Sequence, residues 1–183
     1  MKIALIYISP NGTTRILTNV IAEILSKLGN ITIFDLGRGD LRDPDSIDPI
    51  IFRNYDLLGI GSPTYHLRVF KPVTHFIQTI LPEVPENGSK RSAFVYTTYA
   101  GILSGRTLVN MEKDLHRARY TTLAGLKIKM PHFWGSFKNL PGEHALSLLE
   151  KLPDILLERI ANPPEWKKIY KLFGYQRSFA WRI

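Results

Sequence analysis

The sequence predicts an α/β fold of three layers, in which a doubly wound, five-stranded parallel sheet lies between two layers of helices. Short runs rich in apolar and β-branched residues alternate along the chain with longer runs whose apolar residues recur every three or four positions. This alternation is typical of parallel strands joined by helices. The first strand also runs through a turn of hydroxyls and a glycine straight into a helix, which suits the strand order 2-1-3-4-5.

Five strands are expected, at residues 2–8, 31–36, 55–61, 93–98 and 123–130. The first is a short apolar run rich in β-branched and aromatic residues, as is typical of a buried strand. The last contains Lys127 and Lys129, so it is expected at an edge of the sheet. Right-handed crossovers between parallel strands place helices on both faces of the sheet.

Helices are expected between the strands, at residues 15–28, 69–80, 108–115 and 143–160. The first helix shows the periodicity most clearly. Its apolar residues lie three and four positions apart, at Leu17, Val20, Ile21, Ile24 and Leu28. Pro153 lies inside the last region, where it either kinks the helix or starts a new segment.

Composition is that of a globular protein, with 183 residues of which 44% are hydrophobic and 22% charged. One domain is expected, at residues 1–161. No segment approaches the roughly 20 apolar residues of a membrane span. The absence of cysteine excludes disulfides, thiolate nucleophiles and cysteine-ligated metals, and the histidines show no metal-ligand spacing, so no metal site is expected. No secretory signal is visible, and a cytoplasmic location is expected.

The formal net charge of +8 favours acidic partners. The cations form no lysine block of the kind that marks a nucleic-acid-binding arm, so no nucleic acid is expected as a partner. Residues 162–183 form a separate tail in which aromatic residues and cations alternate. The aromatic residues are Trp166, Tyr170, Phe173, Tyr175, Phe179 and Trp181. The tail is expected to pack on the domain or in a homodimer; a peripheral membrane helix or a dock for an acidic redox protein are the alternatives.

The turn after the first strand, Ser9-Pro10-Asn11-Gly12-Thr13-Thr14, has the features of an anion site. Backbone N–H groups at a helix start have no partner inside the helix, and the helix dipole favours negative charge there. Gly12 allows close approach of the backbone, and the hydroxyls add donors. Ser, Asn and Thr also cap helices without binding any ligand, and the turn alone does not decide between these interpretations.

The position of two further loops favours a ligand site. Residues 62–68 and 97–105 follow the third and fourth strands, as residues 9–14 follow the first. The carboxyl ends of parallel strands meet at one edge of a sheet, and ligands of doubly wound sheets bind there. The three loops are therefore expected to converge on one site.

These motifs resemble those of the flavodoxin-like FMN-binding family over about residues 1–160. The turn at residues 9–14 is similar to the family's phosphate loop, [Ser/Thr]-x-Thr-Gly-x-Thr, with Asn11 where threonine is usual. Gly61-Ser62-Pro63-Thr64-Tyr65 resembles the family's Gly-[Ser/Thr]-Pro-x-Tyr loop, and residues 99–105 take the place of its third loop. The turn followed by Arg15 resembles a branch often joined to a ferredoxin module, whose cysteines this chain lacks.

The resemblance implies a flavodoxin-like fold with FMN as the cofactor. It also implies a set of cofactor-binding residues, namely Ser9, Asn11, Gly12, Thr13, Thr14, Ser62, Pro63, Thr64, Tyr65, Thr97, Thr98, Tyr99, Ala100, Gly101 and Gly105. Tyr65 and Tyr99 would form a slot for the ring by stacking, although either residue also suits an ordinary core or loop position. His66 is the candidate for giving a proton to flavin or substrate.

The function that the resemblance implies is electron transfer between protein partners. Two departures from the family favour two-electron chemistry. Residues 62–68 contain no glycine, whereas many flavodoxins have one there, and the same region carries His66, Arg68 and Lys71 where acidic residues are usual. Positive charge near the ring favours an anionic reduced flavin. The alternatives are therefore an FMN-dependent oxidoreductase with a small-molecule electron acceptor, such as a quinone or porphyrin precursor, and a non-redox interaction module that has lost the flavin.

Overall fold

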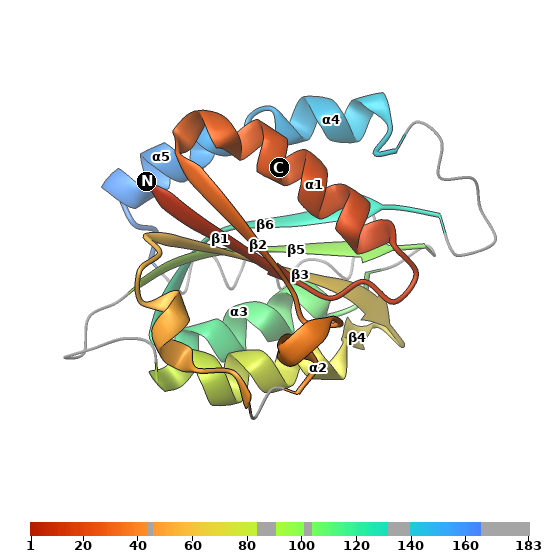
Figure 1. Ribbon diagram of the computed structural model, residues 1–183. Helices are drawn as coiled ribbons and strands as arrows, with labels where there is room; N and C mark the ends of the chain where they lie inside the picture. Colours follow the sequence, from red (N-terminus) through yellow and green to blue (C-terminus); the bar gives the residue numbers. More distant parts are fainter. Residues whose placement is uncertain (44–45, 84–90, 101–103, 132–139, 166–183) are drawn as a thin grey trace.

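The computed structural model describes residues 1–43, 46–83, 91–100, 104–131 and 140–165. A parallel sheet with the order β2-β1-β3-β5-β6 forms its middle layer (Figure 1). These strands are β1 (Lys2–Tyr7), β2 (Asn30–Asp35), β3 (Leu57–Tyr65), β5 (Arg91–Tyr99) and β6 (Tyr120–Lys129). The predicted order 2-1-3-4-5 is confirmed, and β6 lies at an edge as its lysines indicated. A short strand, β4 (Arg68–Val69), pairs antiparallel with the end of β3.

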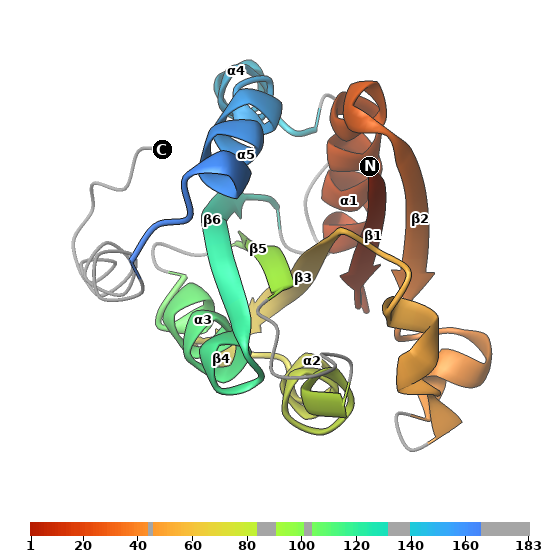
Figure 2. The ribbon, with the colours of Figure 1, turned by 90° about the vertical axis from the view of Figure 1, so that its left-hand side faces the viewer.

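Helices cover both faces of the sheet. One face carries α1 (Thr13–Leu25), α4 (Glu143–Leu149) and α5 (Leu152–Ala161), and the other carries α2 (Lys71–His75) and α3 (Thr107–Arg117). Seen along the sheet, the two groups lie on opposite sides of the strands (Figure 2). A π-helical turn (Phe76–Ile80) continues α2, and 3₁₀ turns lie at Ser26–Leu28, Gly39–Arg42, Pro49–Phe52 and Leu81–Glu83. Pro153 occupies the first turn of α5, so it starts a new helix, where its missing N–H costs nothing.

The side chains of β1 alternate between two cores. Ile3 and Leu5 pack toward α1 and α5, whereas Ala4 and Ile6 pack toward α2, and all four are fully buried. A strand flanked by strands on both sides and by helices on both faces must be apolar on both faces. This accounts for the uninterrupted apolar run at the start of the chain.

Two glycines in β3 make room for aromatic rings of the neighbouring strand. A Cβ atom on Gly59 would lie 2.4 Å from the Phe94 ring, and one on Gly61 would lie 2.3 Å from the Tyr96 ring. The buried Tyr96 hydroxyl lies 2.8 Å from the Thr18 hydroxyl of α1. Close packing across β3 and β5 thus fixes the strand ends that carry the candidate site.

The boundaries differ from the sequence prediction mainly at β3. Residues 62–65 were expected in a loop, but β3 pairs with β5 through Pro63 and with β4 through Tyr65. The pairing of β3 with β1 ends at Gly61, so Pro63 lies where β3 has an edge on that side, a position in which proline is tolerated. No helix in the described ranges is long and apolar enough to cross a membrane.

Candidate functional site

The carboxyl ends of four strands surround a pocket of about 330 Å³. Its lining residues are Asn11, Thr13, Pro63, Thr64, Tyr65, His66, Thr98, Tyr99, Ala100, Met130 and Pro131. The structure thus brings the ends of β1, β3 and β5 together, with a contribution from the end of β6. A concave site of this size at this edge of a doubly wound sheet is suited to a small-molecule ligand.

The loop between β1 and α1 is closed by its own side chains. Ser9 Oγ accepts a hydrogen bond from the Arg15 N–H at 3.0 Å, and Asn11 Oδ1 accepts one from the Thr13 hydroxyl at 2.9 Å. Gly12, at the N-cap of α1, has φ 86° and ψ −17°, a left-handed conformation that glycine adopts at no steric cost. The polar side chains therefore shape the loop, as caps do.

Two backbone N–H groups of this loop remain available to bind a ligand. Within the described residues, the N–H groups of Asn11 and Thr14 donate to no protein acceptor, and the Thr13 N–H has only a long contact of 3.4 Å to Asn11 Oδ1. They flank a glycine at the positive end of a helix of 13 residues. Such a group of donors is suited to an anion. The loop therefore caps the helix and also keeps donors that suit an anion, so the two interpretations of the sequence are compatible.

A network of buried hydroxyls underlies the pocket and joins its loops. The Thr14 and Thr98 hydroxyls lie 2.9 Å apart, which links the first loop to the end of β5. The Thr97 hydroxyl donates to the Ser62 carbonyl at 2.7 Å and lies 3.0 Å from the Thr64 hydroxyl. Bonds of this kind between buried groups fix the relative positions of the strand ends.

Some residues predicted to bind the cofactor lie beneath the pocket or beside it. Ser62 and Thr97 are fully buried, and the Ser62 hydroxyl accepts a hydrogen bond from the Phe70 N–H at 3.1 Å. Gly105 packs against the turn after β3, and Gly101 lies outside the described residues. Ser9 and Thr14 act through the loop and the hydroxyl network.

Met130 and Pro131 also line the pocket, although no motif in the sequence points to them. They follow β6, whose carboxyl end lies next to that of β5, and the Met130 N–H donates to the Tyr99 carbonyl at 2.9 Å. The predicted strand order contained the signal, because it places the residue after the fifth strand beside the third loop. Neither residue carries a polar group that would have drawn attention to it.

The second loop is a two-residue turn between β3 and β4. His66 and Leu67 have φ values of 46° and 62°, and the flanking pairs are Thr64 with Val69 and Tyr65 with Arg68. Positive φ at both central residues is the geometry of a tight hairpin, which normally selects asparagine and glycine. Neither is present here, so the turn must be held from outside.

The third loop holds this turn. The Arg106 N–H donates to the Leu67 carbonyl oxygen at 3.0 Å. Gly105 lies against the same peptide, where a Cβ atom would be 2.2 Å from that oxygen. Hydrogen bonding and close backbone contact together compensate for a backbone conformation that costs roughly 1–2 kcal/mol per non-glycine residue.

Two tyrosines contribute aromatic walls to the pocket. Tyr65 is 38% exposed and its ring lies 4.9 Å from that of Phe70, tilted by 38°. Burial raises the pKa of Tyr99 above the ordinary tyrosine value. Both residues line the pocket, and aromatic side chains of this kind can stack on a flat ring.

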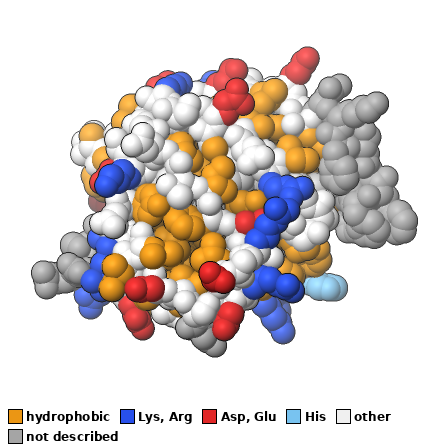
Figure 3. Space-filling view, in the orientation of Figure 1, with side chains coloured by type: hydrophobic (Ala, Val, Ile, Leu, Met, Phe, Trp, Pro, Cys, Tyr) orange, Lys and Arg blue, Asp and Glu red, His pale blue; other side chains and the backbone are white. Residues whose placement is uncertain are grey.

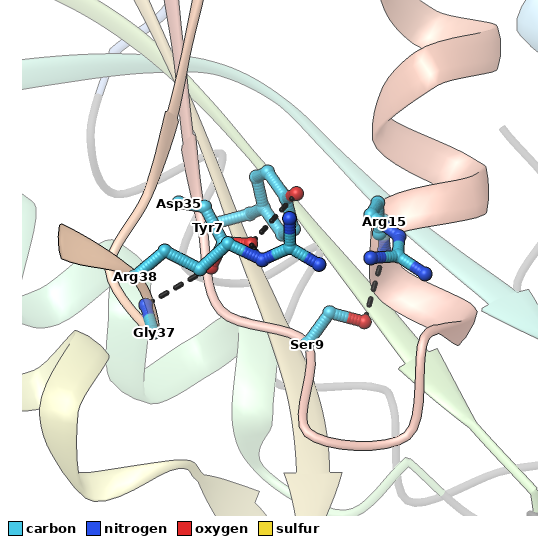
Figure 4. A network of polar contacts seen from close by, with 6 residues as sticks. All are labelled: Tyr7, Ser9, Arg15, Asp35, Gly37 and Arg38. Carbon is cyan, nitrogen blue, oxygen red and sulfur yellow. Dashed lines mark hydrogen bonds and ion pairs between the residues drawn. The ribbon is translucent and has the colours of Figure 1, made fainter. Parts of the chain in front are cut away.

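A polar cluster supports the first loop from the side of β2 (Figure 4). The Tyr7 hydroxyl donates to Asp35 Oδ2 at 3.0 Å, and the Gly37 N–H donates to Asp35 Oδ1 at 2.9 Å. Arg38 Nε lies 3.4 Å from the same carboxylate. Burial and the adjacent Asp35 raise the pKa of Tyr7 to about 12. Asp35 is thus neutralised by several donors.

Positive charge lies close to the first loop. An Arg15 Nη atom would be 3.8 Å from a Cβ atom on Gly12, and Figure 4 shows Arg15 and Arg38 on either side of Ser9. Among the described residues, Arg15 has no carboxylate partner. These guanidinium groups favour an anion at the loop. The described residues contain no group of three or more His, Cys, Asp or Glu side chains that could hold a metal ion.

The sequence matches no protein-family model and no curated protein. Its backbone, however, is similar to flavodoxins of known structure. A flavodoxin from the domain Archaea, 18% identical, aligns with a TM-score of 0.65 over 86% of this chain and 98% of its own. Oxidised flavodoxin 1 from Bacillus cereus, 15% identical, aligns with a TM-score of 0.63 over the same shares of the two chains.

The same architecture occurs within larger proteins. The flavodiiron core from Synechocystis sp., 17% identical, aligns with a TM-score of 0.66 over 90% of this chain but only 37% of that protein. The chain therefore spans a little over a third of the flavodiiron core. Together with the strand order, these likenesses show that the chain has a flavodoxin-like fold.

Proposed function

We propose that this protein binds FMN in the pocket at the carboxyl ends of the strands and transfers electrons between protein partners. The observation that carries the proposal is the first loop, where unpartnered N–H groups of Asn11 and Thr14 flank a left-handed Gly12 at the start of α1. In a flavodoxin-like fold, this loop borders the pocket in which a flat ring would lie. The flavodoxins and flavodiiron cores of similar structure support a redox role.

The chemistry of the donor set fits FMN. The phosphate requires several donors and positive charge, which the first loop and Arg15 supply. The ring requires aromatic or apolar walls, which Tyr65, Tyr99 and Met130 supply. When bound, FMN supplies the capacity to accept and release one or two electrons, while the protein binds and orients it and tunes its surroundings.

His66 is the residue that we assign to proton transfer. It lines the pocket and is exposed to solvent, at the first position of the turn after β3. An imidazole with access to both the pocket and bulk water can take a proton from water and present it to a bound group. The fixed turn holds the histidine backbone in one place.

A second function is favoured by the charge around the pocket. None of its lining residues, all of which are described, is a carboxylate, and Arg68 and Lys71 follow within a few residues of His66. Such surroundings favour a bound group that gains negative charge on reduction. They support two-electron chemistry, and with it an FMN-dependent reductase or oxidase of a small molecule such as a quinone.

The test is a pair of titrations of the purified protein, one with FMN and one with riboflavin, followed by the visible spectrum. We expect FMN to bind at micromolar concentration or below, and riboflavin to bind at least about tenfold more weakly because it lacks the phosphate. Rapid oxidation of a nicotinamide cofactor with a quinone, without a protein partner, would favour the second function. No binding of FMN would contradict the proposal and leave a non-redox interaction module.

A further inference from the structure

The turn after β3 stands out from the surface beside the pocket. Leu67 is 51% exposed and Tyr65 is 38% exposed, although both are large and apolar. Three exposed cations surround them, Arg68 in β4, Lys71 at the start of α2 and Arg106 before α3. We call these five residues the hairpin face. In Figure 3, Lys and Arg side chains and a histidine project at the right of the view, which is the side where the strands end.

A groove of about 580 Å³ continues the hairpin face between α2 and α3. Its lining residues are Arg68, Val69, Lys71, Thr74, His75, Gln78, Asn110, Lys113, Asp114 and Arg117. Its single carboxylate, Asp114, accepts a hydrogen bond from Arg117 at 3.2 Å and is largely buried. The lining therefore has an excess of positive charge, and a cleft lined by one sign of charge concentrates its field.

We propose that the hairpin face and this groove dock the acidic surface of an electron-transfer protein. This inference rests on the proposed function, because it concerns the partner of the same pocket. Specific interfaces combine an apolar centre, often tyrosine, with a charged rim in which arginine is frequent. Leu67 and Tyr65 provide such a centre, and Arg68, Lys71 and Arg106 provide the rim.

The hairpin places this surface directly beside the ligand pocket. Tyr65 and His66 line the pocket, whereas Arg68 and Val69 of the same hairpin line the groove. Tyr65 and Arg68 are opposite each other in the β3–β4 ladder. A protein seated in the groove is thus separated from the pocket by one strand pair, and a short separation is what electron transfer between two proteins requires.

The face is also preorganised. The bond from the Arg106 N–H to the Leu67 carbonyl fixes the turn against α3 before any partner arrives. Surfaces that are ordered in advance lose less conformational entropy on binding. A small polyanion would engage only the cations and leave Leu67 in water, and a membrane surface would not enter a groove between two helices. These features favour a protein.

The test uses the full chain loaded with FMN and two probes of opposite charge. A plant-type [2Fe–2S] ferredoxin, chosen for its acidic surface, and cytochrome c, chosen for its basic surface, are titrated into it by calorimetry. We expect the ferredoxin to bind at least about tenfold more tightly than cytochrome c, and its affinity to fall by about tenfold as salt is raised from about 20 to about 200 mM.

Charge reversals locate the contact. Arg68→Glu and Lys71→Glu should each weaken ferredoxin binding by about tenfold, and Leu67→Ser by about fivefold, when each variant is measured at saturating FMN. Lys27→Glu is the matched control, since it changes the net charge equally. Lys27 is exposed in the turn at the C-terminal end of α1, at the opposite edge of the sheet.

Two results would overturn the docking proposal. Equal weakening by the three charge reversals would show that net charge alone attracts the ferredoxin. Binding of anionic vesicles or duplex DNA through Arg68 and Lys71, without binding of the ferredoxin, would assign the face to a membrane or a nucleic acid. Both results are compatible with tight FMN binding, whereas failure of the wild-type protein to bind FMN would contradict the proposed function itself.

Discussion

The two loops on either side of the pocket both contain left-handed backbone, but it is stabilised by different means. The first, residues 9–14, places its one left-handed residue at Gly12 and is closed by Ser9 and Asn11, its own side chains. The second, the turn at His66 and Leu67, has two left-handed residues and no glycine. Its stabilising bond comes from Arg106, about forty positions along the chain.

The first loop is stabilised by its own residues, whereas the second is stabilised by a segment that is distant in the sequence. A loop whose residues match its backbone needs no help from distant segments, because glycine and capping side chains already favour the required conformation. A loop whose residues oppose its backbone retains its shape only while its surroundings hold it. The first loop is therefore expected to respond to substitutions within it, and the second to substitutions in the loop before α3.

The largest effect is expected from Gly12→Val. Left-handed backbone costs a β-branched residue at least roughly 1–2 kcal/mol, and the loop would relax so that its N–H groups no longer point together. Loss of a donor to a charged acceptor adds roughly 1.5–3 kcal/mol. We expect FMN to bind about 100-fold more weakly and riboflavin to change by less than about threefold, measured by fluorescence titration.

Gly39→Val is the matched control for this substitution. Gly39 also has a positive φ, of 55°, and no atom lies within 4 Å of the position of its Cβ. It lies in a 3₁₀ turn outside the pocket lining. The control should lower thermal stability by a similar amount and leave FMN affinity unchanged. Equal losses of FMN and riboflavin in Gly12→Val would mean that the first loop only caps α1.

The contrast between the loops also explains what the sequence could predict. The strand order, the three layers and the first loop follow from apolar periodicity and from residues that favour their own conformation. The turn at residues 66 and 67 could not be predicted, because histidine and leucine are not turn residues and the group that holds them is distant in sequence. For the same reason, residues 62–65 were expected in a loop, although β4 extends their pairing.

The site was predictable in its position more than in its individual contacts. The resemblance implied that Ser62 and Thr97 bind the cofactor, and in the structure the ladder between β3 and β5 continues through them and buries both side chains. Which residue is the last in a ladder depends on the neighbouring strand. Sequence patterns therefore locate the edge of the sheet to within a few residues and do not determine which side chains face the pocket.

The next largest effect is expected from Gly105→Ala, which tests the tertiary support of the second loop. The new methyl group would lie 2.2 Å from the Leu67 carbonyl oxygen, and alanine is strained at the φ of 57°. We expect the free energy of unfolding to fall by about 2–3 kcal/mol. The displaced turn carries Tyr65, so FMN and riboflavin should weaken alike, each by about tenfold.

The matched control is Gly142→Ala. Gly142 has an ordinary φ of −62° and no neighbour within 4 Å of its Cβ position, so the change should be almost neutral in a denaturant titration. If Gly105→Ala changed the ratio of FMN to riboflavin affinity in the manner of Gly12→Val, the two loops would not act separately, and the comparison would fail.

A gain in stability is expected when the second loop receives the residues that its geometry favours. The double variant His66→Asn with Leu67→Gly supplies the asparagine–glycine pair of tight hairpins. Relief of strain should raise the free energy of unfolding by about 1 kcal/mol, because Leu67 is half exposed and buries little apolar area. His66→Ala, which keeps a Cβ atom, should give no gain. A loss in the double variant would show that side-chain contacts outweigh the strain.

The smallest effect at neutral pH is expected from Tyr7→Phe. This variant tests whether the polar cluster around Asp35 contributes to the conformation of the first loop. Asp35 keeps its bond from Gly37 and its contact with Arg38, so the loss should be about 0.5 kcal/mol. If the loop is locally determined, the ratio of FMN to riboflavin affinity should not change. A change in that ratio would mean that the first loop also depends on tertiary support.

The same variant has a signature in alkali. The pKa of Tyr7 is raised from the unfolded value of about 10 to about 12, so the protonated hydroxyl stabilises the fold at pH values below about 10. This contribution is lost as the pH rises through 12. The stability of the wild-type protein should therefore fall more steeply between pH 10 and 12 than that of Tyr7→Phe, in urea titrations at each pH. Tyr96, Tyr99 and Tyr120, whose pKa values burial also raises, are present in both proteins, so the difference between the two curves reports Tyr7 together with its electrostatic effect on Tyr96. Parallel curves would show that burial and the adjacent Asp35 do not disfavour the ionised form of Tyr7 in the fold.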